Sequence, residues 1–206
     1  MVRNIQTIRF ANPIFSGVWD AEHIECIQIS ALEEVGVETR GGYYDHSGAM
    51  KDMVQNHLFQ ILSIVAMEQP GELMLAGEEM HREQIRVLSA LHTPEKIEES
   101  LVLGQYKGYR EENAVAEDSM TESYAALKVF LDNDRWKGMP FYIRTGKKLG
   151  HREMQVLVVF KPAAPQVQSN ILNIKIQPTE GVYLQFNIKK PGEQDEIAQA
   201  KMDFCQ

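Results

Sequence analysis

His57 and Asp52 lie five residues apart in a segment whose apolar positions recur at helical spacing. Histidine is the side chain best suited to move a proton near neutral pH, so His57 is a candidate general base. The same spacing places His57 beside the apolar stripe that contains Val54 and Ile61, and spacing alone therefore favours a histidine packed in the core. Asp52 lies roughly 140° from His57 around an α-helix, so spacing gives it no role in orienting the ring.

A second candidate is the basic stretch that runs from Arg135 to Arg152 and contains no acidic residue. Its segment RTGKKLGHR places Lys147, Lys148 and Arg152 around a glycine-containing turn. Ammonium and guanidinium groups in such a turn could bind a phosphate. A solvated hairpin tip is an equally good interpretation, and the glycine spacing is not that of a P-loop.

The third candidate is the loop Glu33–Tyr44. Arg40 and the glycine pair 41–42 allow a tight backbone path beside a helix N-terminus, which favours anions. Glu33 and Glu38 could accept hydrogen bonds from sugar hydroxyls. The sequence alone favours a flexible connection with solvated charges. A metal site is not expected, because the histidines do not pair with other ligand residues at the usual spacing.

Helices are predicted to dominate the first half of the chain. Ile24–Ala31 alternates and predicts a strand, and the segment from Ser47 to about Met67 predicts a helix that Pro70-Gly71 ends. A second helix is predicted over Glu78–Leu91. Thr93-Pro94 is typical of the start of a short third helix.

The second half predicts consecutive strands joined by short turns. The expected strands are Glu122–Leu131, Pro140–Arg144, Glu153–Phe160, Asn170–Gln177 and Val182–Ile188. Helices followed by such strands predict an α+β fold, with a large, mostly antiparallel β-sheet and helices packed on one face. The polar segment 107–118 is predicted to be a surface loop. Neither a GxGxxG nor a P-loop motif occurs, so no dinucleotide site is expected on this chain.

Composition excludes several classes of protein. The 206 residues are 44% hydrophobic and 24% charged, as in an ordinary globular protein. A net charge of −8 argues against general nucleic-acid binding, although residues 104–206 hold 14 of the 21 basic residues. No apolar run reaches the ~18–20 residues of a membrane span. Cys26 and Cys205 suggest no disulfide framework, which favours a reducing compartment, the cytoplasm.

Several segments together resemble the glucose-6-phosphate dehydrogenase family. They occur in the family's order and span nearly the whole chain. The most specific is the RGGYYD…QNH run followed by RWKGMPFYIRTGKKL. The matching segments are IRFANPIFSGVW (8–19), ETRGGYYDHSGAMKDMVQNHLFQILSIVAMEQP (38–70), GQY (104–106), DNDRWKGMPFYIRTGKKL (132–149), IQP (176–178) and KKPG (189–192).

The resemblance implies that residues 1–206 form one partial C-terminal domain for substrate binding and dimerisation. The family's N-terminal NADP-binding domain is expected to be absent, together with the DHYLGKE segment that orients the catalytic histidine. The implied activity is oxidation of glucose 6-phosphate to 6-phosphogluconolactone, the first step of the pentose phosphate pathway. NADP accepts the hydride and is bound mainly by the absent domain. This chain alone is expected to be inactive, and to form a homo-dimer or tetramer through its sheet.

The resemblance also implies a role for individual residues. His57 matches the general base that takes the proton from the C1 hydroxyl. The implied substrate-binding residues are Glu33, Asp52, Lys147, Arg152 and Gln177. A second, structural NADP site is not expected, because Glu153 and Lys175 stand where the family's pattern has Lys and Arg.

Two other classes of function stay open. One is a non-catalytic module that binds a sugar phosphate or another anion. The other is an oligomerisation domain, which predicts no response to any ligand.

Overall fold

The computed structural model describes residues 2–69, 77–190, 192 and 196–204. Pro70, Gly71, Pro191 and Cys205 lie outside the described residues. The helical segments are α1 Val2–Phe10, α2 Pro13–Ser16, η1 Glu38–Arg40, α3 Gly41–Tyr44, η2 Met50–Leu58, α4 Phe59–Ala66, α5 Gly77–Ser89, η3 Ile97–Glu99 and η4 Tyr109–Glu111. The strands are β1 Ile24–Leu32, β2 Leu91–His92, β3 Leu101–Gly104, β4 Tyr124–Leu131, β5 Phe141–Gly146, β6 Glu153–Phe160, β7 Ile171–Gln177, β8 Gly181–Lys189 and β9 Ile197–Asp203.

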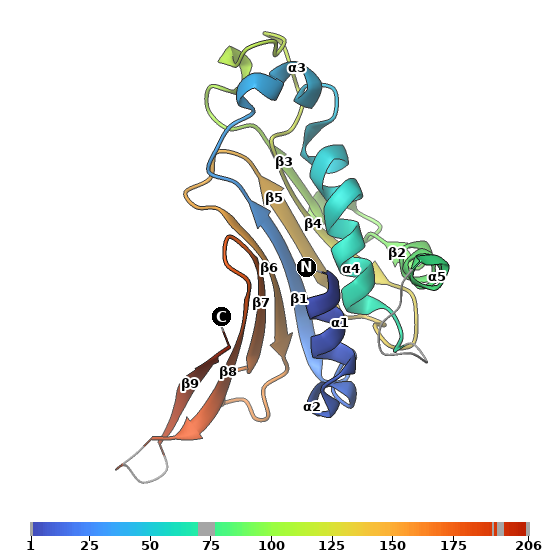
Figure 1. Cartoon of the computed structure of the whole chain (residues 1–206), viewed down its shortest axis with the longest axis vertical. Helices are drawn as coiled ribbons and strands as arrows, with labels where there is room; N and C mark the ends of the chain where they lie inside the picture. The colour runs from blue at the N-terminus through green and yellow to red at the C-terminus, as the bar shows by residue number, and fades with distance from the viewer. Residues whose placement is uncertain (1, 70–76, 191, 193–195, 205–206) are drawn as a thin grey trace.

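The described strands form one sheet of nine, in the order β2-β4-β5-β1-β6-β7-β8-β9, with β3 also paired to β4 (Figure 1). β1 pairs with β5 in parallel, while the other pairs are antiparallel. Short antiparallel connections explain why β6, β7 and β8 follow one another in both sequence and space. The predicted fold class is confirmed.

Alternation along the strands determines which face is buried. In β4, every second residue is buried, from Ala125 to Leu131, and the residues between them are partly exposed. Because successive side chains of a strand point to opposite faces, this pattern turns one face toward a hydrophobic core. Ile5 of α1 and Leu62 of α4 pack into the same core. Helices α1, α2 and α4 lie along that face in Figure 1.

Most of the predicted elements are confirmed, and β6 has the predicted bounds. The short third helix at Thr93-Pro94 is wrong, because these two residues are irregular and only the 3-10 turn Ile97–Glu99 follows. Eight elements were not predicted: α1, α2, η1, α3, β2, β3, η4 and β9. The segment predicted as the loop Glu33–Tyr44 therefore contains two short helical turns, η1 and α3. β3 has only four residues, too few for a clear strand pattern. In β9, residues 198–203 alternate between apolar and polar, so a strand signal was present there.

The predicted Ser47–Met67 helix exists, but its first half is wound differently from an α-helix. Met50–Leu58 forms a π-helix, in which each N–H bonds to the carbonyl about five residues earlier. At its end, the Phe59 N–H bonds to the Val54 carbonyl. α4 continues the same rod to Ala66. π-Helical turns within α-helices are frequent at functional sites.

None of the helices in the described ranges combines the length and apolar character that a membrane crossing requires.

Candidate functional site

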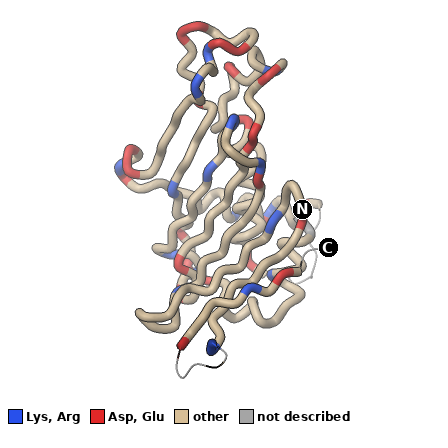
Figure 2. The backbone as a smooth tube through the Cα atoms, turned by 90° about the vertical axis from the view of Figure 1, so that its left-hand side faces the viewer, with Lys and Arg blue, Asp and Glu red and all other residues tan. Residues whose placement is uncertain are grey.

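A pocket of about 380 Å³ opens beyond the end of β1, beside the turn that joins β5 to β6. Its lining includes Glu33, Arg40, Tyr44, Lys147 and Arg152. Three of the predicted substrate residues, Glu33, Lys147 and Arg152, therefore meet in one cavity. In Figure 2, acidic and basic positions lie close together at this upper end of the chain. The pocket offers both cations and carboxylates to a ligand.

Lys147 is the most buried cation of this pocket, and it is not the tip of a solvated hairpin. It is 9% exposed, and its Nζ forms an ion pair with the Glu33 carboxylate. Backbone bonds fix this pair, from the Glu33 N–H to the Gly146 carbonyl (2.9 Å) and from the Leu149 N–H to the Glu33 carbonyl (2.8 Å). An ammonium group has three donors, so the paired lysine keeps donors for a ligand oxygen.

Tyr44 forms the apolar wall beside this lysine. The Lys147 Nζ lies 5.2 Å from the centre of the Tyr44 ring. The Tyr44 hydroxyl is buried and has no hydrogen-bond partner. Burial raises the pKa of Tyr44, and the nearby charges of Asp52 and Glu122 raise it further. The hydroxyl therefore stays protonated across the physiological range.

Arg152 and Gln177 form a more exposed edge of the site. The Arg152 Nη2 donates to the Gln177 Oε1 over 3.2 Å. Both side chains are exposed, and Gln177 is not among the residues that line the pocket. Because β6 and β7 are neighbouring strands, their ends bring these two predicted residues together.

Asp52 lies in the first turn of the π-helix and contacts the pocket through one arginine. The Arg40 Nη2 is 3.8 Å from the Asp52 Oδ1, and Arg40 lines the pocket. The Tyr43 hydroxyl also donates to this oxygen, over 3.3 Å. The Asp52 side chain is 13% exposed. The structure thus places Asp52 next to the pocket but outside its lining.

His57 is exposed, so the core interpretation of this histidine is wrong. The π-helix explains the error, because its wider turn buries Val54 and Leu58 and leaves His57 outside. The same winding changes the relation to Asp52. Five residues make a little more than one turn of a π-helix, so the two side chains are closer in rotation around the helix than the roughly 140° of an α-helix. His57 itself does not line the pocket.

The N-terminus of this helix is capped by a residue from another part of the chain. The Met50 N–H donates to the Glu122 Oε1 over 2.8 Å, and the Ala49 N–H donates to the Glu122 carbonyl over 2.9 Å. Ala49 has no side chain that could cap the helix. Glu122 therefore satisfies amide groups that a helix start leaves without intrahelical partners.

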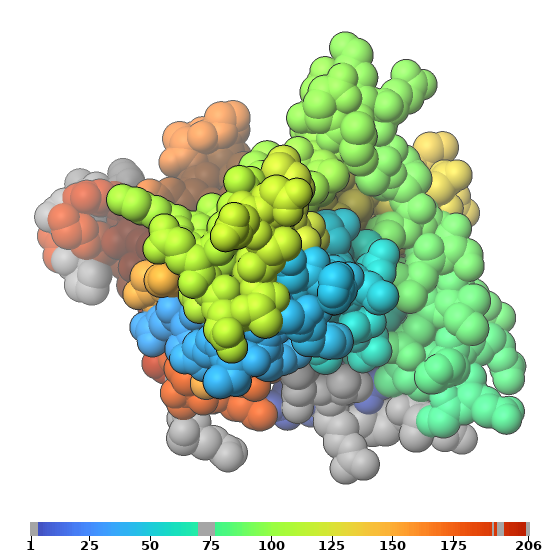
Figure 3. Space-filling view, turned by 90° about the horizontal axis from the view of Figure 1, so that it is seen from above, coloured from blue at the N-terminus to red at the C-terminus, as the bar shows by residue number. Residues whose placement is uncertain are grey.

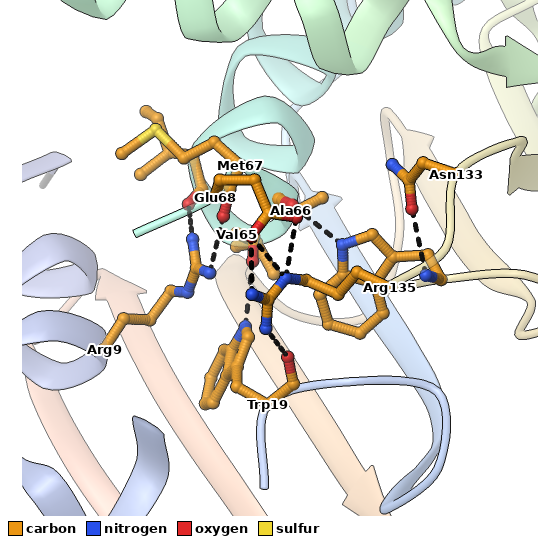
Figure 4. Close-up of polar contacts among 10 residues, drawn as sticks. Arg9, Trp19, Val65, Ala66, Met67, Glu68, Asn133 and Arg135 are labelled. Carbon is orange, nitrogen blue, oxygen red and sulfur yellow. Dashed lines mark hydrogen bonds and ion pairs between the residues drawn. The ribbon is translucent and has the colours of Figure 1, made fainter. Parts of the chain in front are cut away.

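The C-terminus of the helix is capped by buried side chains, shown in Figure 4. Arg9 donates to the carbonyls of Ile64 (2.6 Å) and Met67 (2.7 Å). Two indole N–H groups donate to the two carbonyls that lie between these in the chain. The Trp19 Nε1 donates to the Val65 carbonyl over 2.9 Å, and the Trp136 Nε1 donates to the Ala66 carbonyl over 2.7 Å. All four of the last carbonyls that a helix leaves free are thus bonded.

The charge of Arg9 in this cap interacts with the nearby charges of Arg135 and Glu68. Burial lowers the pKa of Arg9 to about 9; Arg135 lowers it further and Glu68 opposes the shift. Arg135 donates to the Glu68 carboxylate from Nε (2.9 Å) and Nη2 (2.5 Å). These bonds lower the pKa of Glu68 and raise that of Arg135.

A small second core lies above the pocket, where the segment 107–118 packs against the loop Glu33–Tyr44 (Figure 3). It contains Tyr44 and Tyr109, whose rings meet edge to face at 6.3 Å. The Tyr109 hydroxyl donates to the Asp45 Oδ1 over 3.0 Å. The segment 107–118 lies on the surface as predicted, but Tyr109 within it is buried.

Two titratable groups of this second core have shifted pKa values. Burial would raise the pKa of Asp45, but hydrogen bonds from Ser119, the Ala116 N–H and Tyr109 outweigh it and the pKa is lowered. Burial raises the pKa of Tyr106 to about 12, and the bond from its hydroxyl to Glu112 adds to the shift. Both groups therefore keep their usual charge at neutral pH.

Sequence reasoning missed the tyrosines and Glu122. Tyr44, Tyr106 and Tyr109 stand in segments that are otherwise polar, and large aromatic residues in a polar segment are a signal of local burial. Glu122 gave no such signal, because a glutamate before a strand is usually solvated.

In the described part of the chain, no group of three or more His, Cys, Asp or Glu side chains could hold a metal ion.

Comparison with known families gives one match over most of the chain. Residues 6–206 match the family model described as glucose-6-phosphate dehydrogenase, C-terminal domain. Among curated proteins, the glucose-6-phosphate 1-dehydrogenase of Chlamydia trachomatis is 43% identical, over 98% of this chain and 50% of that protein. The enzyme of the same name from Bacillus subtilis is 41% identical, over 100% of this chain and 46% of that protein.

Solved structures of the same family have the same fold. A glucose-6-phosphate dehydrogenase in complex with its substrate glucose-6-phosphate superposes with a TM-score of 0.89 at 32% identity, covering 99% of this chain and 44% of that one. The Mycobacterium avium glucose-6-phosphate 1-dehydrogenase gives a TM-score of 0.89 at 34% identity, over 99% and 46%. The chain spans half or less of the length of these relatives.

Proposed function

The chain belongs to the glucose-6-phosphate dehydrogenase family, as its C-terminal domain, and from this premise we propose that it supplies the sugar-phosphate side of that active site. The complete reaction oxidises glucose 6-phosphate to 6-phosphogluconolactone, with NADP as the hydride acceptor. We propose that residues 1–206 act as one C-terminal domain, for substrate binding and for dimerisation.

The observation that carries this proposal is the pocket in which Glu33, Lys147 and Arg152 meet. Lysine and arginine both donate charge-assisted hydrogen bonds to phosphate and hydroxyl oxygens, and the glutamate can accept hydrogen bonds from sugar hydroxyls. A cavity of about 380 Å³ lies within the usual size range of small-molecule sites.

We assign the sugar hydroxyls to the two carboxylates and the other oxygens to the basic side chains. Glu33 and Asp52 accept hydrogen bonds from sugar hydroxyls, and Lys147 and Arg152 donate to the sugar phosphate. Gln177 holds Arg152 through their 3.2 Å hydrogen bond and completes the edge of the site. The Glu33–Lys147 ion pair holds both side chains in the lining of the pocket.

His57 is the proposed general base. It removes the proton from the C1 hydroxyl while the C1 hydrogen leaves as hydride, which turns the hemiacetal carbon into the lactone carbonyl. Histidine suits this step because its usual pKa lies near neutral pH. Its exposed ring and its position one turn from Asp52 allow a sugar that contacts Asp52 to reach it as well.

The described residues do not fit a dinucleotide site. Such a site needs parallel strands joined by a helix that follows a glycine-rich turn. Within the described ranges the only parallel pair is β1 with β5, and three strands lie between them in sequence. We propose that NADP is bound mainly by an N-terminal dinucleotide-binding domain. This chain alone is then expected to form no NADPH from glucose 6-phosphate.

We also propose a homo-dimer or tetramer that assembles through the sheet. The face opposite the helices carries a groove of about 450 Å³ lined by residues that include Val102 and Tyr142. Their exposure of 60% and 41% leaves apolar surface in contact with water. Light scattering at high concentration checks this, since a monomer would contradict it. The family relation and the free thiol of Cys26 support a cytoplasmic location.

An NMR titration of this chain with glucose 6-phosphate tests the sugar-phosphate site. We expect saturable shifts at the His57 ring and at the Lys147 amide. Lys147→Met removes a charge-assisted donor worth about 1.5–3 kcal/mol, so the Kd should rise about ten-fold or more. Lys137→Met is the matched control, since Lys137 lies in the same basic stretch but outside the pocket.

The titration also separates the other two functions. Equal shifts with glucose and glucose 6-phosphate would contradict recognition of the phosphate. If the chain is only a binding module, the ligand should shift the NMR signal of the Lys147 amide and leave that of the His57 ring unchanged. No shift at millimolar ligand would leave the oligomerisation domain as the better description of this chain.

A further inference from the structure

Glu122 and Ser123 lie between the two halves of the proposed site. The Glu122 carbonyl and carboxylate accept the Ala49 and Met50 amides, at the start of the helix that carries Asp52 and His57. The next carbonyl, that of Ser123, accepts the Lys147 N–H over 3.0 Å. One peptide segment thus holds both the helix and the lysine turn.

The neighbouring residues make this segment rigid. The Ser123 N–H donates to the Gly104 carbonyl over 2.8 Å, and the Ser123 Oγ accepts the Tyr106 N–H over 2.9 Å. The Thr121 Oγ1 donates to the Asp45 carbonyl over 2.6 Å. A displacement of Glu122 would therefore have to disturb several bonds at once.

Gly48 leaves the space that the Glu122 carboxylate occupies. Gly48 has a φ of +65°, and a Cβ there would lie 2.4 Å from the Glu122 Oε1. A side chain at position 48 would occupy the place of the carboxylate. Glu122 forms the cap and Gly48 leaves room for it, so the helix that starts at Met50 needs no capping side chain on Ala49.

The cap lies at the first turn, where the direction and rotation of the helix are set. Asp52 is in this turn, and His57 follows one π-helical turn later. A negative group at a helix N-terminus is also favoured by the helix dipole. Glu122 does not line the pocket, and its carboxylate is already bonded to the Met50 N–H.

We propose that Glu122 is a positioning residue, which sets the rotation of the helix bearing Asp52 and His57 relative to Lys147. This inference rests on the proposed function for its meaning, but its geometry can be tested without a ligand. The expected consequence is that loss of the cap separates the two halves of the site while each half stays intact.

The experiment uses the ¹⁵N-labelled chain with Glu122→Ala, Glu122→Asp and Glu122→Gln. Residual dipolar couplings of amides 50–58 and of β5 report the orientation of the helix without ligand. Titration with glucose 6-phosphate then reports both halves of the site. Glu117→Ala is the matched control, because Glu117 is exposed in the preceding segment.

We expect the helix orientation to change in Glu122→Ala and in Glu122→Asp, whose shorter side chain cannot reach Met50 without moving the helix. Glutamine keeps an acceptor oxygen, so Glu122→Gln and Glu117→Ala should match the wild type. With ligand, Glu122→Ala should keep the Lys147 shifts and lose those at His57.

Wild-type orientation and both sets of shifts in Glu122→Ala would overturn the proposal. If Glu122→Ala does not fold, the contrast between Asp and Gln decides, and equal orientations in these two would overturn it. If the wild-type chain shows no shifts with glucose 6-phosphate, the proposed function fails, while the dipolar couplings still test the positioning role.

Discussion

The helix that carries Asp52 and His57 is held in different ways at its two ends. At its N-terminus one glutamate accepts two amides beside an open pocket. At its C-terminus four carbonyls receive donors from Arg9, Trp19 and Trp136, whose exposures are 4%, 2% and 0%. The end that carries Asp52 and His57 thus depends on one residue, through its carboxylate and its backbone carbonyl, and the far end depends on a buried network.

The difference follows from what each end must do. A buried carbonyl without a donor costs about 1–3 kcal/mol, so the C-terminal network contributes mainly to stability. The N-terminal cap is partly exposed, and water can replace part of what it provides. The molecule therefore anchors the helix far from the pocket and sets its orientation next to the pocket.

Breaking the C-terminal end should have the largest effect. Arg9→Met keeps the bulk of the side chain but leaves the Ile64 and Met67 carbonyls without donors. We expect a loss of about 2–4 kcal/mol in the free energy of unfolding, below the sum of two full penalties because the charge is no longer buried. Urea denaturation followed by circular dichroism measures it.

The control for this change is Arg82→Met on the exposed side of α5. It should alter the stability by no more than about 0.5 kcal/mol. A urea midpoint for Arg9→Met equal to that of Arg82→Met would show that the buried network does not anchor the helix.

Disrupting the N-terminal cap should lower the free energy of unfolding by a smaller amount. Gly48→Ala introduces a side chain at φ +65° and displaces the Glu122 carboxylate. Gly138 has a φ of +79° with nothing within 4 Å of a Cβ, so Gly138→Ala measures the backbone strain alone. That strain is about 1–2 kcal/mol, and Gly48→Ala should cost about 1 kcal/mol more, the worth of the displaced hydrogen bond. Thermal unfolding of both variants measures the difference.

A double-mutant cycle completes the comparison. In a Glu122→Ala background the carboxylate is gone, so the two glycine substitutions should then cost the same. An excess cost of Gly48→Ala that persists without Glu122 would mean that Gly48 is required for another reason.

The regular parts of the fold could be predicted from the sequence, because alternation and helical spacing are local signals. Glu153–Phe160 was placed correctly for this reason. The π-helix could not be predicted, since an N-terminal cap from 72 residues away helps to set where it begins. His57 was expected in the core because its position was taken from α-helical spacing. In a π-helix the same residue lies on the exposed side.

In the candidate site too, some residues could be predicted from the sequence and others could not. The resemblance predicted Glu33 and Lys147 as substrate-binding residues, and the structure places them in one ion pair although 114 residues separate them. The resemblance also contained Trp19 and Trp136 without indicating their purpose. Only the structure shows that these residues serve the far end of the helix, 46 and 70 residues away in sequence.

The smallest expected effect is a pH dependence at the C-terminal end. Bonds from Arg135 lower the pKa of Glu68 below its usual value of 4.5. The stabilising contribution is therefore complete above pH 4.5, and it is lost as the pH falls through the folded-state pKa. Because the Glu68 side chain is 59% exposed, Glu68→Gln should cost no more than about 1 kcal/mol at pH 7.

Urea denaturation of wild type and Glu68→Gln from pH 7 to pH 3 measures this dependence. The gap in unfolding free energy between them should stay constant down to about pH 4.5 and then close, because the wild-type carboxylate becomes neutral like the amide. Glu99→Gln, which alters a 66% exposed carboxylate paired with Lys96, serves as the control. A gap that persists unchanged to pH 3 would mean that Glu68 stabilises the helix end through packing, and that the ionic part of this end is no stronger than the surface around it.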